Sequence, residues 1–127
     1  RLGEDLGLAY QIQDDILGIW GQPEVTGKPV GDDIRSRKKT LPIVYALSQA
    51  GSAADRLRDL FAQAQLTETE VTQAIALLEE CGARAYAEQL ADQRLQAALA
   101  ELKGASPEPA VGEALQQFAN ALVQRAR

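Results

Sequence analysis

The segment from Leu6 to Trp20 constrains the fold most, because it can form one long uninterrupted helix. It contains no proline, and apolar residues recur along it at helical spacing, at Ala9, Ile12, Ile16 and Ile19. Aromatic residues make up only 5% of the chain, whereas alanine is common, a composition that favours closely packed helices over a sheet. We therefore expect residues 1–20 to form the first helix of an all-α chain, with Gly21 as its C-terminal cap.

Polar residues share one face of this predicted helix. Positions related by i, i+3, i+4 and i+7 spacing are occupied by Gln11, Asp14, Asp15 and Gly18. A carboxylate pair on a helix is more often solvated than functional, which is the simplest interpretation of this pair. The residues that follow the helix support a second interpretation.

A loop is predicted over residues 21–35, which are interrupted by Pro23, Gly27, Pro29 and Gly31. The loop carries Lys28 and a second carboxylate pair, and a basic run that includes Lys38 and Lys39 follows it. A flexible loop can fold these lysines back towards the first carboxylate pair. A magnesium-bound diphosphate requires this combination, since the hard cation takes oxygen ligands while ammonium groups contact the remaining phosphate charge.

Helical patterns continue through the rest of the chain. The predicted helices cover about Leu41–Ala50, Asp55–Gln65, Thr67–Gly82, Ala83–Lys103 and Val111–Arg127. Thr40 can cap the first of these, and Thr67-Glu68-Thr69-Glu70 is a capping-box signature. The last is expected to turn its apolar side inward, at Leu115, Phe118, Leu122 and Val123.

Composition excludes several classes of protein. A net charge of −5 argues against a nucleic-acid partner, and the absence of histidine removes the commonest general base and transition-metal ligand. The single cysteine, Cys81, cannot form an internal disulfide; it fits a reducing cytoplasm and is interpreted as a packing residue. Without a long apolar stretch or a signal-peptide pattern, the chain is expected to be soluble, with no transmembrane segment.

The segment from Tyr10 to Pro42 resembles the second aspartate-rich region of the trans-isoprenyl diphosphate synthases, also called polyprenyl synthetases. That family shows Phe/Tyr-Gln-Ile-x-Asp-Asp-x-x-Asp, followed by Gly-Lys, Gly-x-Asp and Lys-x-Thr-Leu-Pro. The chain departs from this pattern at Gly18, where the family has a third aspartate, and Asp32 adds a carboxylate where the family varies. The matching positions, in order, are Tyr10, Gln11, Ile12, Asp14, Asp15, Gly27, Lys28, Gly31, Asp33, Lys38, Thr40, Leu41 and Pro42.

The resemblance implies an antiparallel helical bundle of the isoprenoid synthase type and a trans-prenyltransferase activity. In such enzymes magnesium ions hold the diphosphate of an allylic substrate between two aspartate-rich motifs. Isopentenyl diphosphate attacks the allylic carbocation, and proton loss then gives a longer polyprenyl diphosphate. The implied partners of the protein are therefore these two diphosphates, with Mg²⁺ as cofactor.

The same resemblance assigns roles to individual residues. Asp14 would bind magnesium directly, while Asp15 and Asp33 would act through water or as acceptors behind the direct ligand. These three residues form the predicted metal site. The predicted diphosphate-binding residues are Gln11, Lys28 and Lys38, and the predicted catalytic residues are Asp14, Lys28 and Lys38.

Half of the family's machinery is missing from this chain. It contains neither the first aspartate-rich motif nor the isopentenyl-diphosphate pocket that precedes it in the family. We therefore expect residues 1–127 to be the C-terminal part of a single isoprenoid-synthase domain, with the N-terminal part absent. The parent is expected to be a cytoplasmic homodimer, and the isolated chain to be inactive and to self-associate through exposed apolar stripes.

Two other hypotheses stay open. The chain could belong to a non-catalytic partner subunit that keeps the fold, an interpretation that Gly18 favours and that the retained aspartates and lysines oppose. It could also be a helical domain with an incidental acidic and basic loop, which the length of the matching motif opposes. A paired aspartate-rich motif in the upstream sequence would favour the enzyme over the partner subunit.

Overall fold

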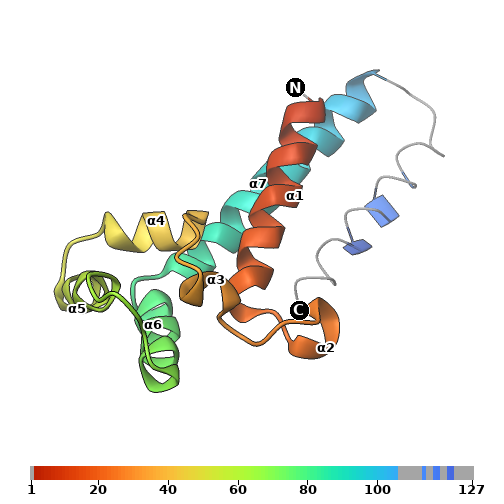
Figure 1. The fold of residues 1–127 in the computed structure, drawn as a ribbon. Coiled ribbons are helices and arrows are strands. Elements are labelled where there is room, and N and C mark those ends of the chain that lie inside the picture. The colour runs from red at the N-terminus through yellow and green to blue at the C-terminus, as the bar shows by residue number, and fades with distance from the viewer. Residues whose placement is uncertain (1, 106–112, 114–115, 118–119, 122–127) are drawn as a thin grey trace.

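The computed structural model describes residues 2–105, 113, 116–117 and 120–121, and these residues contain helices but no strand, which confirms the all-α prediction. Of the expected helix over 111–127, all four inward residues lie outside the described residues. Figure 1 shows the arrangement of the helices. They are α1 (Leu2–Trp20), α2 (Pro23–Thr26), α3 (Asp32–Arg35), α4 (Leu41–Leu47), α5 (Ser52–Phe61), α6 (Glu68–Glu80) and α7 (Ala83–Ala105).

The long helices α1 and α7 run antiparallel and side by side, and α4, α5 and α6 pack at one end of this pair (Figure 1). Ile12, Ile16 and Ile19 of α1 are buried, as their helical spacing predicts. Small residues on α7 allow the close approach of the two helices, because Ala87 and Ala91 lie in the same core cluster. At the far end, Asp5 is buried and its carboxylate lies 3.3 Å from Nη1 of Arg94.

Local sequence signals fix the start of α6 and the junction between α6 and α7. The capping box at Thr67 and Glu70 is present, with both reciprocal hydrogen bonds, and starts α6 as predicted. Gly82 takes a positive φ of 76° between α6 and α7. Cys81 packs partly buried against the core, and burial raises the pKa of its thiol, consistent with a packing residue.

The prediction of a plain loop over residues 21–35 is wrong, because this segment contains the one-turn helices α2 and α3. Pro23 occupies the first turn of α2, where its missing N–H costs nothing, and two aspartates in the first turn of α3 suit the helix dipole. Gly21 does not take the left-handed conformation of a glycine cap. It is instead crowded, since a Cβ at this position would meet Thr26 Cγ2 at 2.7 Å.

Gly31 fixes the position of α3 against the rest of the chain. Its N–H donates to the carbonyl of Ile19 at 2.9 Å, and its φ is 80°. A Cβ at this position would lie 2.8 Å from Cγ1 of Val71 on α6. Gly31 therefore combines a left-handed backbone with a close approach between elements.

We expect Gly31→Ala to lower the stability of the protein by about 2–4 kcal/mol, because it adds a clash to an unfavourable φ. Gly27 is the matched control, since its φ is 73° but a Cβ there would meet nothing within 4 Å. Gly27→Ala should cost only about 1–2 kcal/mol. Thermal denaturation of the two variants measures the difference, and equal losses would show that the contact with Val71 is unimportant.

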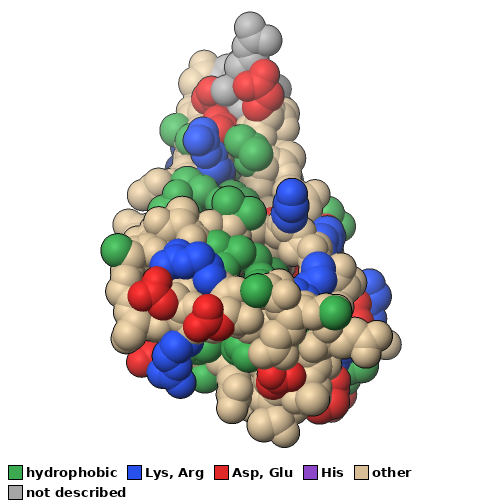
Figure 2. Space-filling view, turned by 60° about the vertical axis from the view of Figure 1, so that its left-hand side comes forward, with side chains coloured by type: hydrophobic (Ala, Val, Ile, Leu, Met, Phe, Trp, Pro, Cys, Tyr) green, Lys and Arg blue, Asp and Glu red, His purple; other side chains and the backbone are tan. Residues whose placement is uncertain are grey.

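Apolar side chains also reach the surface. Figure 2 shows them on one face of the molecule, between Lys/Arg and Asp/Glu side chains. The exposed large apolar residues that the structure describes are Leu8, Tyr10, Val25, Val44 and Tyr86. None of the described helices combines the length and apolar character that crossing a membrane requires.

Candidate functional site

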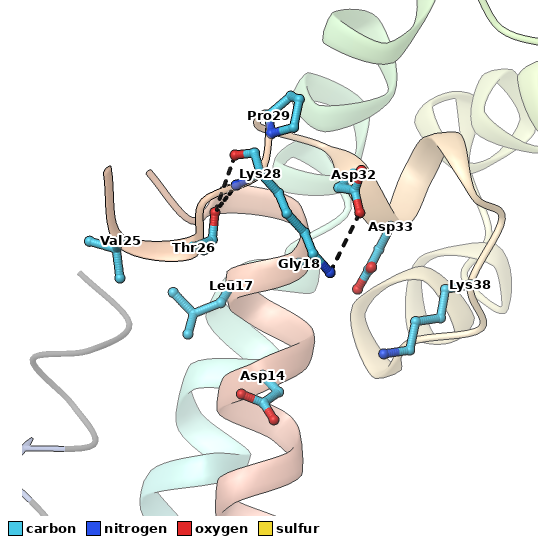
Figure 3. A pocket seen from close by; sticks show the side chains of 10 residues that line it. All are labelled: Asp14, Leu17, Gly18, Val25, Thr26, Lys28, Pro29, Asp32, Asp33 and Lys38. Carbon is cyan, nitrogen blue, oxygen red and sulfur yellow. Dashed lines mark hydrogen bonds and ion pairs between the residues drawn. The ribbon is translucent and has the colours of Figure 1, made fainter. Parts of the chain in front are cut away.

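A cavity of about 340 Å³ lies between the C-terminal half of α1 and the segment that carries α2 and α3 (Figure 3). Carboxylates and ammonium groups from separate elements line it together with a few apolar side chains. Lys28 and Lys38 therefore lie at the cavity beside the helix, as the sequence predicts, whereas Lys39 does not line it. The lining residues are Asp14, Leu17, Gly18, Val25, Thr26, Lys28, Pro29, Asp32, Asp33 and Lys38.

Asp14 and Gly18 lie one turn apart on α1, and both face the cavity (Figure 3). The carboxylate of Asp33 lies directly over Gly18, so closely that a Cβ at position 18 would overlap its carboxyl carbon and one oxygen. The carboxylate from α3 thus occupies the space beside Gly18, where an aspartate side chain would begin. This arrangement brings Asp33 to the same wall of the cavity as Asp14.

The Asp33 side chain is largely buried, and its electrostatic surroundings are mixed. Burial raises the pKa of its carboxyl group above the usual value of 3.8, the Lys38 ammonium opposes this shift, and the carboxylates of Asp32 and Asp15 add to it. A carboxylate that is costly to ionise in the free protein gains from a cation placed beside it.

In metal-free solution this shift predicts a pH-dependent stability. Between pH 3.8 and the raised pKa the folded state binds more protons at Asp33 than the unfolded state, so stability falls as pH rises through this window. Asp33→Asn removes the ionisable group. We expect the melting temperature of this variant to gain on the wild type as pH rises from about 4 to about 7 in a chelating buffer. A melting-temperature difference that does not vary with pH would contradict the role of burial at Asp33.

The two lysines come from different segments, Lys28 from before α3 and Lys38 from after it. The Lys28 ammonium lies 3.9 Å from a carboxylate oxygen of Asp32, and Lys28 remains well exposed. Lys38 follows α3, is exposed, and extends towards the cavity that Asp14 and Asp33 line (Figure 3). Exposed ammonium groups on flexible stems can reach an anion that enters the cavity without first breaking buried contacts.

Asp15 lies away from this cavity. It is buried, with one carboxylate oxygen accepting a hydrogen bond from Nε2 of Gln11 at 3.0 Å and the other from the N–H of Leu41 at 3.0 Å. Asp15 therefore caps the first turn of α4. Thr40 does occupy the N-cap position of α4, but its side chain makes no capping bond, so the expected hydroxyl cap is replaced by this carboxylate.

The cavity residues fit a magnesium site that is completed by its ligand. Within the described residues, no group of three or more His, Cys, Asp or Glu side chains is arranged to hold a metal by itself. Magnesium commonly binds through one or two carboxylates plus substrate phosphates and waters. Asp14 and Asp33 supply such carboxylates, while Lys28 and Lys38 supply positive charge for the phosphates.

The sequence predicted most of the charged residues of the cavity but not the other side chains that line it. Leu17, Val25, Thr26 and Pro29 were not predicted as site residues. The spacing of Leu17, three residues after Asp14, could have indicated its position on the helix face. The structure brings Asp14, Lys28, Asp33 and Lys38 together as predicted candidates, whereas Gln11 and Asp15 do not line the cavity.

Comparison with known proteins identifies the fold family. A sequence profile described as polyprenyl synthetase matches residues 1–78, which is more than half of the chain. The chain belongs to the polyprenyl synthetase family. Among related polyprenyl synthetases, a geranylgeranyl diphosphate synthase of Mycobacterium tuberculosis is 48% identical over 110 residues, which cover 86% of this chain and 31% of that protein. A short chain isoprenyl diphosphate synthase of Methanothermobacter thermautotrophicus is 37% identical over 123 residues, covering 97% of this chain and 37% of that protein.

A solved polyprenyl synthetase structure supports the same assignment. The enzyme from Streptomyces coelicolor A3(2) superimposes with a TM-score of 0.88 at 36% identity, over 96% of this chain and 38% of that one. The polyprenyl synthetase chain described here thus spans about a third of the length of its relatives.

Proposed function

We propose that the protein carrying this chain is a trans-prenyltransferase that condenses an allylic diphosphate with isopentenyl diphosphate to make a longer polyprenyl diphosphate. The observation that carries the proposal is the cavity in which carboxylates from α1 and α3 lie beside two lysines. The names of the relatives, prenyl diphosphate synthases of several product lengths, support the reaction class. The comparisons add no support for a non-catalytic partner subunit, since these relatives are named as synthases.

The residues of this chain would act by charge complementarity. Lys28 and Lys38 bind the diphosphate of the allylic substrate and stabilise the negative charge that builds on it as the carbon–oxygen bond breaks. Leu17 and Val25 add apolar side chains to the wall of this cavity.

Asp14 and Asp33 are proposed to hold magnesium, with Asp14 as the direct ligand and Asp33 acting through water or as an acceptor behind it. Bound magnesium would offset the diphosphate charge and make it a better leaving group. A solved geranylgeranyl pyrophosphate synthase of Corynebacterium glutamicum, 31% identical with a TM-score of 0.78, is complexed with isoprenyl diphosphate and magnesium. Asp15 and Gln11 are proposed to support the site from outside the cavity, through the start of α4.

The proposal also implies how the whole protein is organised. Residues 1–127 would form the C-terminal part of one isoprenoid-synthase domain, whose N-terminal part supplies the first aspartate-rich motif. Homodimeric assembly and a cytoplasmic location stay predictions. The chain alone is expected to be inactive, since its cavity holds only one half of the diphosphate site.

The test is a condensation assay on the whole protein that carries this chain. Labelled isopentenyl diphosphate is supplied with a series of allylic diphosphates of increasing length and with Mg²⁺. The proposal predicts a longer labelled prenyl diphosphate, whose formation stops when the metal is chelated. Failure of every allylic diphosphate in the series to give product would refute it.

A further inference from the structure

Arg37 has an unusual backbone conformation at the turn that leads into Lys38. Among the described residues it is the one non-glycine residue with a positive φ, at 58°. A left-handed conformation is unfavourable for a residue with a Cβ, and it persists only where surrounding contacts hold it. Arg37 immediately precedes Lys38, which lines the cavity, so the contacts of Arg37 affect the position of Lys38.

The turn is a Schellman motif in which arginine occupies the place that glycine normally takes. Ser36 is the C-cap of α3, the Arg37 N–H donates to the Ile34 carbonyl at 3.2 Å, and the Lys38 N–H donates to the Asp33 carbonyl at 3.0 Å. One motif therefore fixes the backbones of two cavity residues, Asp33 and Lys38, relative to each other. The left-handed residue between them sets the direction in which the chain leaves α3.

The side chain of Arg37 supplies the contacts that hold this turn. Its Nη1 donates to the carbonyl of Phe61 at 2.7 Å, and its Nη2 donates to the carbonyl of Gln63 at 2.6 Å. The guanidinium carbon also lies 5.4 Å from the centre of the Phe61 ring. Phe61 is the last residue of α5, where carbonyls lack helical partners and a cation is favoured.

We propose that Arg37 is a positioning residue for the diphosphate site: its guanidinium anchors the Asp33–Lys38 turn to the end of α5 and so sets where the Lys38 ammonium can reach. This inference rests on the proposed function, in which Lys38 binds the substrate diphosphate. Glycine would satisfy the backbone of the turn at no conformational cost, but it could not make the contacts to Phe61 and Gln63. The arginine therefore adopts an unfavourable backbone conformation, and its side chain connects the turn to the end of α5.

The experiment compares Arg37 with a matched arginine that is remote from the cavity. Arg58 also binds two carbonyls near the end of a helix, with Nη1 2.7 Å from the carbonyl oxygen of Leu47 and 3.1 Å from that of Gln49. Arg37→Gln, Arg37→Gly and Arg58→Gln are measured in the whole protein for kcat, for the KM of the allylic diphosphate and for circular dichroism. We expect both Arg37 variants to raise KM about tenfold, and Arg58→Gln to leave it within about twofold.

Any of the following outcomes overturns the proposal. A wild-type KM for Arg37→Gly would mean that the backbone motif alone positions Lys38, and equal KM changes for Arg37→Gln and Arg58→Gln would indicate a general loss of structure. If Arg37→Gly does not fold, Arg37→Lys replaces it. Lysine lacks the planar fork of guanidinium donors, so Arg37→Lys must still raise KM. Lys38→Ala separates this proposal from the proposed function. An unchanged KM for Lys38→Ala would refute the binding of the diphosphate by Lys38. A raised KM for Lys38→Ala, together with a wild-type KM for the Arg37 variants, would refute only the positioning role of Arg37.

Discussion

Asp14→Ala should lower turnover of the whole protein on the order of 10²–10³-fold while changing its stability little. Asp14 faces the cavity and is the proposed direct magnesium ligand, so its removal takes away an oxygen that no neighbouring group replaces with equal charge. Because the side chain is only partly buried and lies at the cavity wall, its truncation should remove little packing. Steady-state turnover and thermal denaturation of the same preparation measure the two effects.

Asp15→Ala is the matched control, since Asp15 is the adjacent carboxylate on the same helix. Its removal leaves the N–H of Leu41 without its partner and should cost about 1–3 kcal/mol of stability. Its effect on turnover should be smaller than that of Asp14→Ala. If Asp14→Ala leaves turnover within a few-fold of the wild type, or if the two variants exchange these effects, the metal assignment is wrong.

Restoring the family's third aspartate should impair the proposed prenyltransferase activity. Gly18→Asp is expected to lower turnover about tenfold or more, because the carboxylate of Asp33 already fills the space beside residue 18. The two carboxylates would also repel each other in a partly buried site. Turnover at saturating magnesium is the measurement, and Gly18→Ala separates the effect of bulk from that of charge.

The pairing of residues 18 and 33 is tested by a double-mutant cycle. Gly18→Asp combined with Asp33→Gly should recover part of the lost turnover, because the new carboxylate can occupy the vacated space. Effects that simply add would show that the two positions are independent. A strong rise in activity for Gly18→Asp alone would mean that Asp33 does not compensate for the missing aspartate and that this chain comes from a weakened member of the family.

The parts of the structure that could be predicted from the sequence are those that depend on local patterns. Helix α1 follows from the spacing of Ile12, Ile16 and Ile19, and the start of α6 follows from its capping box. The charged residues of the cavity were predicted from the resemblance to the second aspartate-rich region of the polyprenyl synthetases. The one-turn helices α2 and α3 were missed because proline and glycine signal a break in regular structure but do not exclude a single helical turn.

Contacts between distant segments could not be predicted in the same way. Asp15 and Asp14 are adjacent in the sequence, yet a rotation of about 100° around the helix axis turns Asp15 towards Leu41, 26 residues away. The left-handed conformation of Arg37 could not be predicted either, since the contacts of its side chain are with carbonyls at and after the end of α5. Propensity alone would have placed glycine in that position.

Calorimetric titration of the whole protein with inorganic pyrophosphate, in the presence and absence of Mg²⁺, tests the central claim most directly, because it isolates the diphosphate site from the rest of the reaction. The account predicts binding that requires Mg²⁺, is lost in Asp14→Ala and is weakened in both Lys28→Ala and Lys38→Ala. Binding of equal strength without Mg²⁺, or binding that none of these substitutions alters, would contradict the assignment of this cavity as the magnesium and diphosphate site.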